Sequence, residues 1–199
     1  MVYFLLDILG QGQQATVFFA KKRAKSDLKT TLETVAVRMY NHSNFHSGDP
    51  KNDIKTLERF NREQLAQQEL RSPHLIAQKE LIKTGNAFYQ VMEFANGGTL
   101  FDVMRQRKKL TEKEAWHVIK SVLLGVRDLQ DKLYMHRDIK ADNIVLHWPE
   151  MGSRALTSQQ KEELYACNLV AAQVKLCDLG FVRKLGPQET CVSFDCGNL

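Results

Sequence analysis

The sequence predicts an α+β fold with two lobes, in which an antiparallel sheet precedes a mainly helical part. The first 95 residues contain five short runs of bulky or β-branched residues, separated by polar turns and interrupted by one amphipathic stretch. From residue 96 on, apolar residues recur at helical spacing. We therefore expect a small lobe over residues 1–95, a helical lobe over residues 96–199, and a ligand cleft between them.

Composition supports an ordinary globular protein. The 199 residues contain 28 Lys and Arg against 23 Asp and Glu, which gives a formal net charge of +5. With 43% hydrophobic and 26% charged residues, a mainly disordered chain is excluded. A basic balance permits a nucleic-acid-binding protein, but an excess of this size is usual for a solvated surface. No nucleic-acid partner is therefore expected.

Targeting and cysteine signals favour an intracellular protein. No run approaches the roughly 18 apolar residues that cross a bilayer, and residues 1–7 lack a basic leader. No two of the four cysteines form a CxxC pair, which favours reduced thiols over a metal site or a disulfide. We expect a cytoplasmic or nuclear protein that does not bind membranes.

The elements of the first part follow in chain order. Apolar runs predict strands over 3–9, 16–19, 34–37, 75–82 and 88–94. Between the third and fourth strands, Asp53 can cap a helix that ends before Pro73. The turn Asn96-Gly97-Gly98 closes the last strand.

The second part begins with a long helix. Thr111 and Glu114 form a capping box, and the helix that follows carries an apolar stripe, which predicts burial. The stripe consists of Ala115, Val118, Ile119, Val122, Leu123, Val126 and Leu129. Further along, residues 147–173 separate two strands and contain the run Ser158 to Leu164. This run predicts an inserted surface helix without a function of its own.

The most informative segment is His136-Arg137-Asp138-Ile139-Lys140-Ala141-Asp142-Asn143, directly after the long helix. It matches the catalytic loop H-R-D-x-x-x-x-N of protein kinases at every specified position. The sequence resembles the eukaryotic protein kinase domain from its first strand into the activation segment. Lys140 resembles the residue found in the Ser/Thr branch. The resemblance implies the two-lobed kinase fold, ATP and Mg²⁺ as cofactors, and a protein substrate.

The resemblance also implies the roles of the catalytic residues. Asp138 would accept or orient the proton of the substrate hydroxyl, and Lys140 would neutralise charge on the phosphoryl group. Asn143 and Asp178 would hold Mg²⁺. Asp178 belongs to Cys177-Asp178-Leu179-Gly180, which resembles the family's D-F-G motif with Leu in place of Phe.

Nucleotide contacts are implied for a glycine loop, an apolar roof and floor, and a hinge. The loop Gly10-Gln11-Gly12-Gln13-Gln14-Ala15 would cover the phosphates, because glycine lets backbone amides approach closely. Met92 resembles the gatekeeper of the hinge, and backbone groups of Glu93 and Ala95 would bind adenine. The full set of expected nucleotide-binding residues is Leu9, Gly10, Gly12, Ala15, Val17, Ala36, Arg38, Met92, Glu93, Ala95 and Val145.

One catalytic position departs from the family. Val35-Ala36-Val37-Arg38 is similar to V-A-I-K, with Arg38 where the family has a phosphate-binding Lys. Glu63 is the expected partner of Arg38, and Glu69 is the alternative. The planar five-donor fork of Arg is not equivalent to a compact ammonium, and a shift of about 1 Å in phosphate position could cost roughly a hundredfold in rate.

A second departure concerns the same helix. Four residues after Glu63, the family has an aliphatic residue where this sequence has Gln67. A buried amide needs a hydrogen-bond partner, and Gln78 on the next strand is a candidate. If Glu69 were the residue that pairs with Arg38, this requirement would not arise.

The end of the chain departs from the family as well. Thr190 and Ser193 are candidate phosphorylation sites, and Cys196-Gly197 resembles the family's C-G-T-P with Asn198 in place of Thr. The later helices of the family's large lobe are absent. We expect an incomplete lobe, with poor solubility or a regulatory partner that covers the apolar stripe.

Two functions remain open at this point. The motifs favour a protein serine/threonine kinase that uses Mg-ATP and the residues Asp138, Lys140, Asn143, Asp178, Arg38 and Glu63. Arg38, Gln67 and the missing helices favour a nucleotide-binding pseudokinase or scaffold with weak or no transfer.

Overall fold

The computed structural model describes residues 1–12, 15–23, 32–41, 45, 48–152, 154–167 and 169–186. The candidate phosphorylation sites Thr190 and Ser193 and the Cys196-Gly197-Asn198 segment lie outside this range, as do Gln13 and Gln14 of the glycine loop. Within the described residues, no helix has the length and hydropathy that a bilayer crossing requires.

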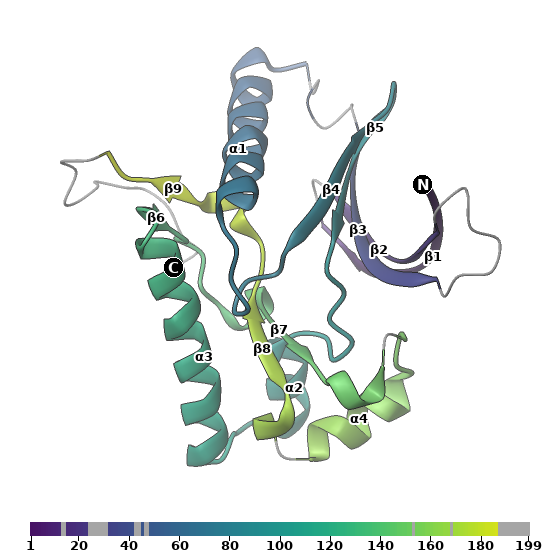
Figure 1. Ribbon diagram of the computed structural model, residues 1–199, viewed down its shortest axis with the longest axis vertical. Helices are drawn as coiled ribbons and strands as arrows, with labels where there is room; N and C mark the ends of the chain where they lie inside the picture. The colour runs from purple at the N-terminus through teal and green to yellow at the C-terminus, as the bar shows by residue number, and fades with distance from the viewer. Residues whose placement is uncertain are drawn as a thin grey trace.

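The N-terminal half is a single antiparallel sheet, as the sequence predicts. Its strand order is β1-β2-β3-β5-β4, so each strand lies next to one that is near it in the chain (Figure 1). The strands are β1 (Val2–Gln11), β2 (Thr16–Arg23), β3 (Glu33–Asn41), β4 (Gln78–Lys83) and β5 (Ala87–Met92). Ala20, Val35, Val37 and Val91 form a buried apolar cluster on this sheet.

One helix, α1 (Pro50–Glu69), stands beside the sheet (Figure 1). It begins three residues before the predicted cap Asp53, which lies in its first turn. The cap is Asp49, whose side chain accepts a hydrogen bond from the Lys51 amide at 3.0 Å. Pro50 explains the difference, because its fixed φ suits the first helical position and it has no N–H to satisfy.

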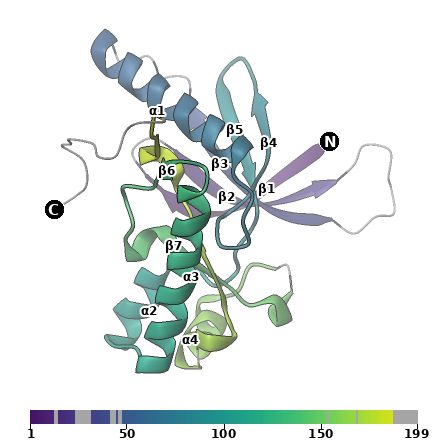
Figure 2. The ribbon, with the colours of Figure 1, turned by 60° about the vertical axis from the view of Figure 1, so that its left-hand side comes forward.

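The C-terminal half is mainly helical and lies below the sheet in both ribbon views (Figures 1 and 2). Its helices are α2 (Leu100–Arg107), α3 (Glu112–Gln130) and α4 (Ser158–Ala166). Two short antiparallel pairs, β6 (Tyr134–Met135) with β9 (Arg183–Lys184) and β7 (Ile144–His147) with β8 (Gln173–Leu176), complete it. The α+β class is therefore confirmed.

The capping box at the start of α3 is present. Thr111 accepts a hydrogen bond from the Glu114 amide, and the Glu114 carboxylate accepts one from the Thr111 amide. The apolar stripe is covered only in part by the described residues. Val118 and Leu129 are buried, whereas Ile119 and Leu123 are 53% and 59% exposed.

The insertion at residues 147–173 lies only in part on the surface. The helix predicted there is confirmed as α4, but Trp148 and Leu169 are 2% and 0% exposed and belong to the main core. The Asn96 side chain donates to the carbonyls of Trp148 and Gly152 and accepts from the Trp148 amide. The predicted surface helix is confirmed, because Tyr165 is the one buried residue of α4. The prediction missed that apolar residues on both sides of α4 enter the core, which the polar sequence of the helix does not indicate.

Gly97 packs directly against this insertion. A Cβ atom on Gly97 would lie 2.2 Å from Cζ3 of Trp148, a distance that real contacts do not reach. The Tyr165 hydroxyl donates to the Gly97 carbonyl oxygen at 2.7 Å. The insertion is thus fastened to the segment that joins the two halves.

Candidate active site

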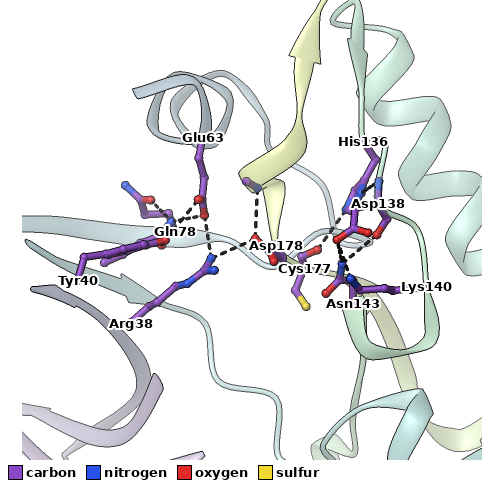
Figure 3. A network of polar contacts seen from close by, with 12 residues as sticks. Arg38, Tyr40, Glu63, Gln78, His136, Asp138, Lys140, Asn143, Cys177 and Asp178 are labelled. Atoms are coloured by element: carbon purple, nitrogen blue, oxygen red, sulfur yellow. Dashed lines mark hydrogen bonds and ion pairs between the residues drawn. The ribbon is translucent and has the colours of Figure 1, made fainter. Parts of the chain in front are cut away.

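Arg38 lies at the centre of a charged cluster between the two halves (Figure 3). Its Nη1 atom is 3.2 Å from Oε1 of Glu63 on α1 and 3.2 Å from Oδ1 of Asp178, which follows β8. The expected pairing of Arg38 with Glu63 is therefore present. Glu69, the alternative, forms an ion pair with Lys184 instead.

Burial and charge act in opposite directions in this cluster. Burial raises the pKa of Glu63 above its ordinary value, and Arg38 offsets only part of that effect. Burial also acts on Asp178, but Arg38 and the Gly180 amide outweigh it, so the pKa of Asp178 lies below its ordinary value. Arg38 is itself desolvated, yet Tyr40, Glu63 and Asp178 hold its pKa above the ordinary value. Arg38 is thus a fixed positive charge.

Asp178 adopts a left-handed backbone conformation with φ 59°. Its Oδ1 atom accepts the Gly180 amide, which caps a short turn over Leu179–Phe181. The next residue, Leu179, is 2% exposed and lies in the main core, as expected for the apolar residue of this motif. Burial raises the pKa of the neighbouring Cys177 thiol to about 12, so this thiol is not a nucleophile at neutral pH.

Asp138 is held by two neighbours on its own loop. Its Oδ2 atom accepts a hydrogen bond from Nδ2 of Asn143 at 2.9 Å and lies 3.0 Å from Nζ of Lys140 (Figure 3). Nδ2 of Asn143 also donates to the Asp138 carbonyl at 2.9 Å. The three residues that the sequence predicts to act together are thus in direct contact.

His136 joins this loop to the Asp178 segment. Its Nδ1 atom accepts the Asp138 amide at 3.3 Å, and its Nε2 atom lies 3.1 Å from the Cys177 carbonyl oxygen. Burial lowers the pKa of His136, so the ring is neutral and donates from Nε2. The Cys177 amide in turn donates to the Asn143 carbonyl at 2.9 Å. These bonds fix the Asp138 loop relative to Asp178.

The donor atoms at this junction fit a magnesium ion. Within the described residues, Asn143 bonds through Nδ2 and Asp178 through Oδ1, which leaves one oxygen of each side chain for a ligand. Mg²⁺ prefers such oxygen donors and is commonly bound by one or two of them together with substrate phosphates. No group of three or more His, Cys, Asp or Glu able to bind a metal occurs in the described part of the chain.

The expected adenine contacts are brought together only in part. Val17 and Met92 pack against a cluster that contains Ala36, and the strand register pairs Ala36 with Met92. Ala15 instead packs against the aromatic cluster of Tyr40, Phe45 and Phe60.

Val145 lies on β7, opposite Lys175. Leu9 and Gly10 lie on β1, where Gly10 pairs with Val17, and Leu9 is 42% exposed. Gly12 follows β1, and its amide bonds to the Ala15 carbonyl.

The hinge contains an ion pair that the sequence did not suggest. Oε1 of Glu93 is 2.7 Å from Nζ of Lys175, a residue only 8% exposed. The Glu93 amide donates to the Ala77 carbonyl at 2.9 Å, so its carbonyl and the backbone of Ala95 are the hinge groups left for a ligand. Ala155, from the insertion, packs against the same cluster as Val17 and Met92.

Sequence reasoning also missed Tyr40 and Gln90. The Tyr40 hydroxyl donates to Oε2 of Glu63 at 3.3 Å, and Nε2 of Gln90 donates to Oε1 of Glu63 at 3.2 Å. Two signals were available in the sequence. Tyr40 lies two positions after Arg38 and so shares its face of the strand, and Gln90 is a lone amide within an apolar strand.

Comparison with known proteins agrees with this geometry. Residues 3–198 match a family model described as "Protein kinase domain". Human serine/threonine-protein kinase ULK1 is 31% identical over 179 residues, which are 90% of this chain and 15% of that protein. The probable serine/threonine-protein kinase fhkD of Dictyostelium discoideum is 27% identical over 98% of this chain and 22% of its own length.

A third relative matches a shorter stretch. The SNF1-related protein kinase catalytic subunit alpha KIN12 of Arabidopsis thaliana is 40% identical over 77 residues, which are 39% of this chain and 16% of that protein. The chain therefore matches less than a quarter of the length of each of these relatives.

Proposed function

Because this chain belongs to the protein kinase family, we propose that it is a protein serine/threonine kinase that transfers the γ-phosphoryl group of Mg-ATP to a protein hydroxyl. One observation carries the proposal. Asp138, Lys140 and Asn143 are in direct contact, and backbone hydrogen bonds tie their loop to the segment of Asp178. Phosphoryl transfer needs such fixed charges more than it needs covalent chemistry.

Asp138 is the residue that receives the acceptor substrate. Both neighbouring donors engage its Oδ2 atom, so Oδ1 is the oxygen that can accept the hydrogen bond of a Ser or Thr hydroxyl. That bond orients the hydroxyl toward the phosphoryl group. The Asp138 carboxylate then takes the proton of the hydroxyl as transfer proceeds. Lys140, 3.0 Å from Asp138, supplies positive charge where the transferred group gains negative charge.

Arg38 and Glu63 serve the nucleotide. Glu63 is 3% exposed and orients Arg38, whose remaining guanidinium N–H groups can donate to the α- and β-phosphates. Asn143 and Asp178 offer one side-chain oxygen each for Mg²⁺, which when bound screens the charge of the phosphates. Val17, Ala36 and Met92 supply the apolar surface for adenine.

A second function, a nucleotide-binding pseudokinase, is favoured by one contact. Arg38 reaches Oδ1 of Asp178 at 3.2 Å, so the carboxylate that would hold Mg²⁺ is already neutralised in part by the protein. An enzyme that must first weaken this ion pair binds Mg-ATP less well. Under this alternative, the protein binds nucleotide and transfers no phosphoryl group.

Transfer of labelled phosphate from Mg-ATP to a generic basic protein distinguishes the two. The enzyme predicts transfer that falls about 10²–10⁴-fold in Asp138→Asn, because a positioned acid–base group contributes that much. Asp178→Asn should abolish transfer as well. Asp131→Asn, a change at the C-cap of α3 that touches none of these groups, is the control and should retain full activity.

The pseudokinase predicts a different pair of results. Mg-ATP would raise the melting temperature of the wild-type protein while no phosphate is transferred. Transfer that persists in both Asp138→Asn and Asp178→Asn would contradict the proposed roles, since it would come from a contaminant or from other residues.

A further inference from the structure

A chain of buried amides lies behind Glu63 and has no role in the transfer proposed above. Gln90 is 0% exposed, Gln64 is 6% and Gln67 is 5%, and Gln78 connects them. Burying a side-chain amide costs desolvation free energy that hydrogen bonds must offset. Apolar residues of similar size at these four positions would not have that cost. The hydrogen bonds of these four glutamines indicate what the amides contribute to the structure.

The strand register brings Gln90 next to Arg38. The two residues are direct partners in the antiparallel ladder of β3 and β5, so their side chains share the face of the sheet that α1 covers. Nε2 of Gln90 donates to Oε1 of Glu63 at 3.2 Å and to Oε1 of Gln78 at 2.7 Å. Both amide hydrogens of Gln90 are therefore used, which fixes its orientation.

Each carboxylate oxygen of Glu63 therefore accepts a hydrogen bond from a neutral side chain, in addition to the bond from Arg38. Oε1 accepts hydrogen bonds from Arg38 and from Gln90, both at 3.2 Å. Oε2 lies 3.3 Å from the hydroxyl of Tyr40, which Figure 3 shows beside Arg38 and Glu63. Hydrogen bonds from neutral donors stabilise the ionised carboxylate against the cost of burial. They also restrict the directions from which Arg38 can approach.

The other amides of this series, those of Gln78, Gln64 and Gln67, hold α1 against the sheet. Nε2 of Gln78 donates to Oε1 of Gln64 at 2.9 Å, and the Gln78 backbone amide donates to Oε1 of Gln67 at 3.3 Å. This is the partner that the sequence suggested for Gln67. Three residues of α1 thus bond to amides of β4 and β5, so the loss of one bond leaves two others that hold the helix against the sheet.

We propose that Gln90, oriented by Gln78, is a positioning residue that keeps Arg38 between Glu63 and Asp178. An arginine fork can bind one carboxylate through two nitrogens, and full engagement of Glu63 in that way would draw Arg38 away from Asp178. Gln90 occupies an acceptor position of Oε1, and Tyr40 occupies one of Oε2. The single-nitrogen contact, with Nη1 shared between Glu63 and Asp178, is the arrangement that remains.

The consequence for catalysis rests on the proposed kinase function. Gln90→Met keeps the side-chain length and removes both donors, so Arg38 is expected to engage Glu63 through two nitrogens, which leaves fewer of its N–H groups for the phosphates. We expect kcat for phosphoryl transfer to fall about tenfold or more, the usual effect of losing a hydrogen bond to a charged group, with a smaller change in KM for a protein substrate. Gln64→Met is the matched control, because the Gln64 side chain belongs to the same series of amides but bonds to Gln78 and not to the Glu63 carboxylate in the described part of the protein. It should keep kcat within about twofold.

A double-mutant cycle separates positioning from general loosening. In a Glu63→Gln background, Gln90→Met should cause no further loss of kcat, because the carboxylate through which it acts is gone. An undiminished loss in that background, or equal losses in Gln90→Met and Gln64→Met, would overturn the proposal.

A second readout does not depend on transfer. If the wild-type protein transfers no phosphate at all, the proposed function fails, and the side-chain NMR signal of Arg38 tests the inference alone. A shift of the Arg38 Nε–H resonance in Gln90→Met but not in Gln64→Met supports it, and equal spectra of Arg38 in the two variants reject it.

Discussion

Arg107 on α2 and Glu114 on α3 form a doubly hydrogen-bonded ion pair beside the insertion. Nη1 and Nη2 of Arg107 lie 2.7 and 2.8 Å from the two oxygens of Glu114, whose side chain is 2% exposed. Oε1 of Glu114 also accepts the Leu169 amide of the insertion at 3.1 Å. Arg107→Gln would therefore leave a buried carboxylate without its cation. We expect this change to destabilise both the start of α3 and the Leu169 segment of the insertion, because Glu114 bonds to both.

The magnitude follows from burial. Removing one member of a buried pair costs about 3–5 kcal/mol. The low end applies because the Arg107 side chain is 20% exposed and Glu114 keeps its bonds to Thr111 and Leu169. A loss of about 3 kcal/mol lowers the melting temperature of a domain of this size by roughly 6–12 °C. Arg105→Gln is the matched control, since Arg105 lies on the same helix, is 72% exposed and is 3.7 Å from Asp102. An exposed pair of this kind is worth about 0–1 kcal/mol.

Thermal and urea unfolding of the two variants measure the difference in the free energy of unfolding. The pH dependence of that difference tests whether it comes from the Glu114 carboxylate. Hydrogen bonds from Arg107 hold the pKa of Glu114 well below its usual range, against the effect of burial. A carboxyl with a depressed folded pKa stabilises above its unfolded pKa of about 4.3 and loses that contribution as the pH falls further. The gap between wild type and Arg107→Gln should thus be constant near pH 7 and narrow below about pH 4. Equal melting of Arg107→Gln and Arg105→Gln, or a gap that widens in acid, would refute this reasoning.

Two further changes test the hinge and the phosphate-binding position. Gly97→Ala would bring a Cβ atom to 2.2 Å from Trp148 and 2.8 Å from the Leu146 carbonyl, so we expect a loss of about 1–3 kcal/mol in the free energy of unfolding. Gly85→Ala, in open space at the β4–β5 turn, is its control, and equal stability of the two variants would argue against close packing at residue 97. Arg38→Lys restores the compact ammonium that the family uses and should raise kcat about tenfold if phosphate position limits the rate. An unchanged kcat would show that Arg38 is not the limiting departure.

The catalytic motifs could be read from the sequence because each is local. The eight residues from His136 to Asn143 lie on one loop, and their mutual contacts depend on short-range backbone geometry. The runs of bulky and β-branched residues likewise predicted the sheet, because such side chains are typical of strands. The helix cap was misplaced at Asp53 because two acids near the helix start satisfy the same rule, and Pro50 decides between them.

Other features depended on contacts between residues far apart in the chain. Glu63 and Glu69 are both acidic residues of α1, and only the rotation of the helix decides that Glu63 meets Arg38 while Glu69 meets Lys184. The shared contact of Arg38 with Asp178 joins residues 140 positions apart. The amide chain of Gln90, Gln78 and Gln64 follows from the register of β3, β5 and β4 against α1.

The sequence by itself determined the α+β class, the order of the elements and the kinase-like motif of residues 136–143, because period, turn residues and loop motifs are properties of neighbouring residues. The tertiary structure decided how those parts meet. It showed that residues 147–173 enter the core, that Asn96 and Gly97 bind them, and that Arg38 is shared by two carboxylates. These outcomes depend on packing and on the balance of burial against charge, which arise only when distant segments are brought together.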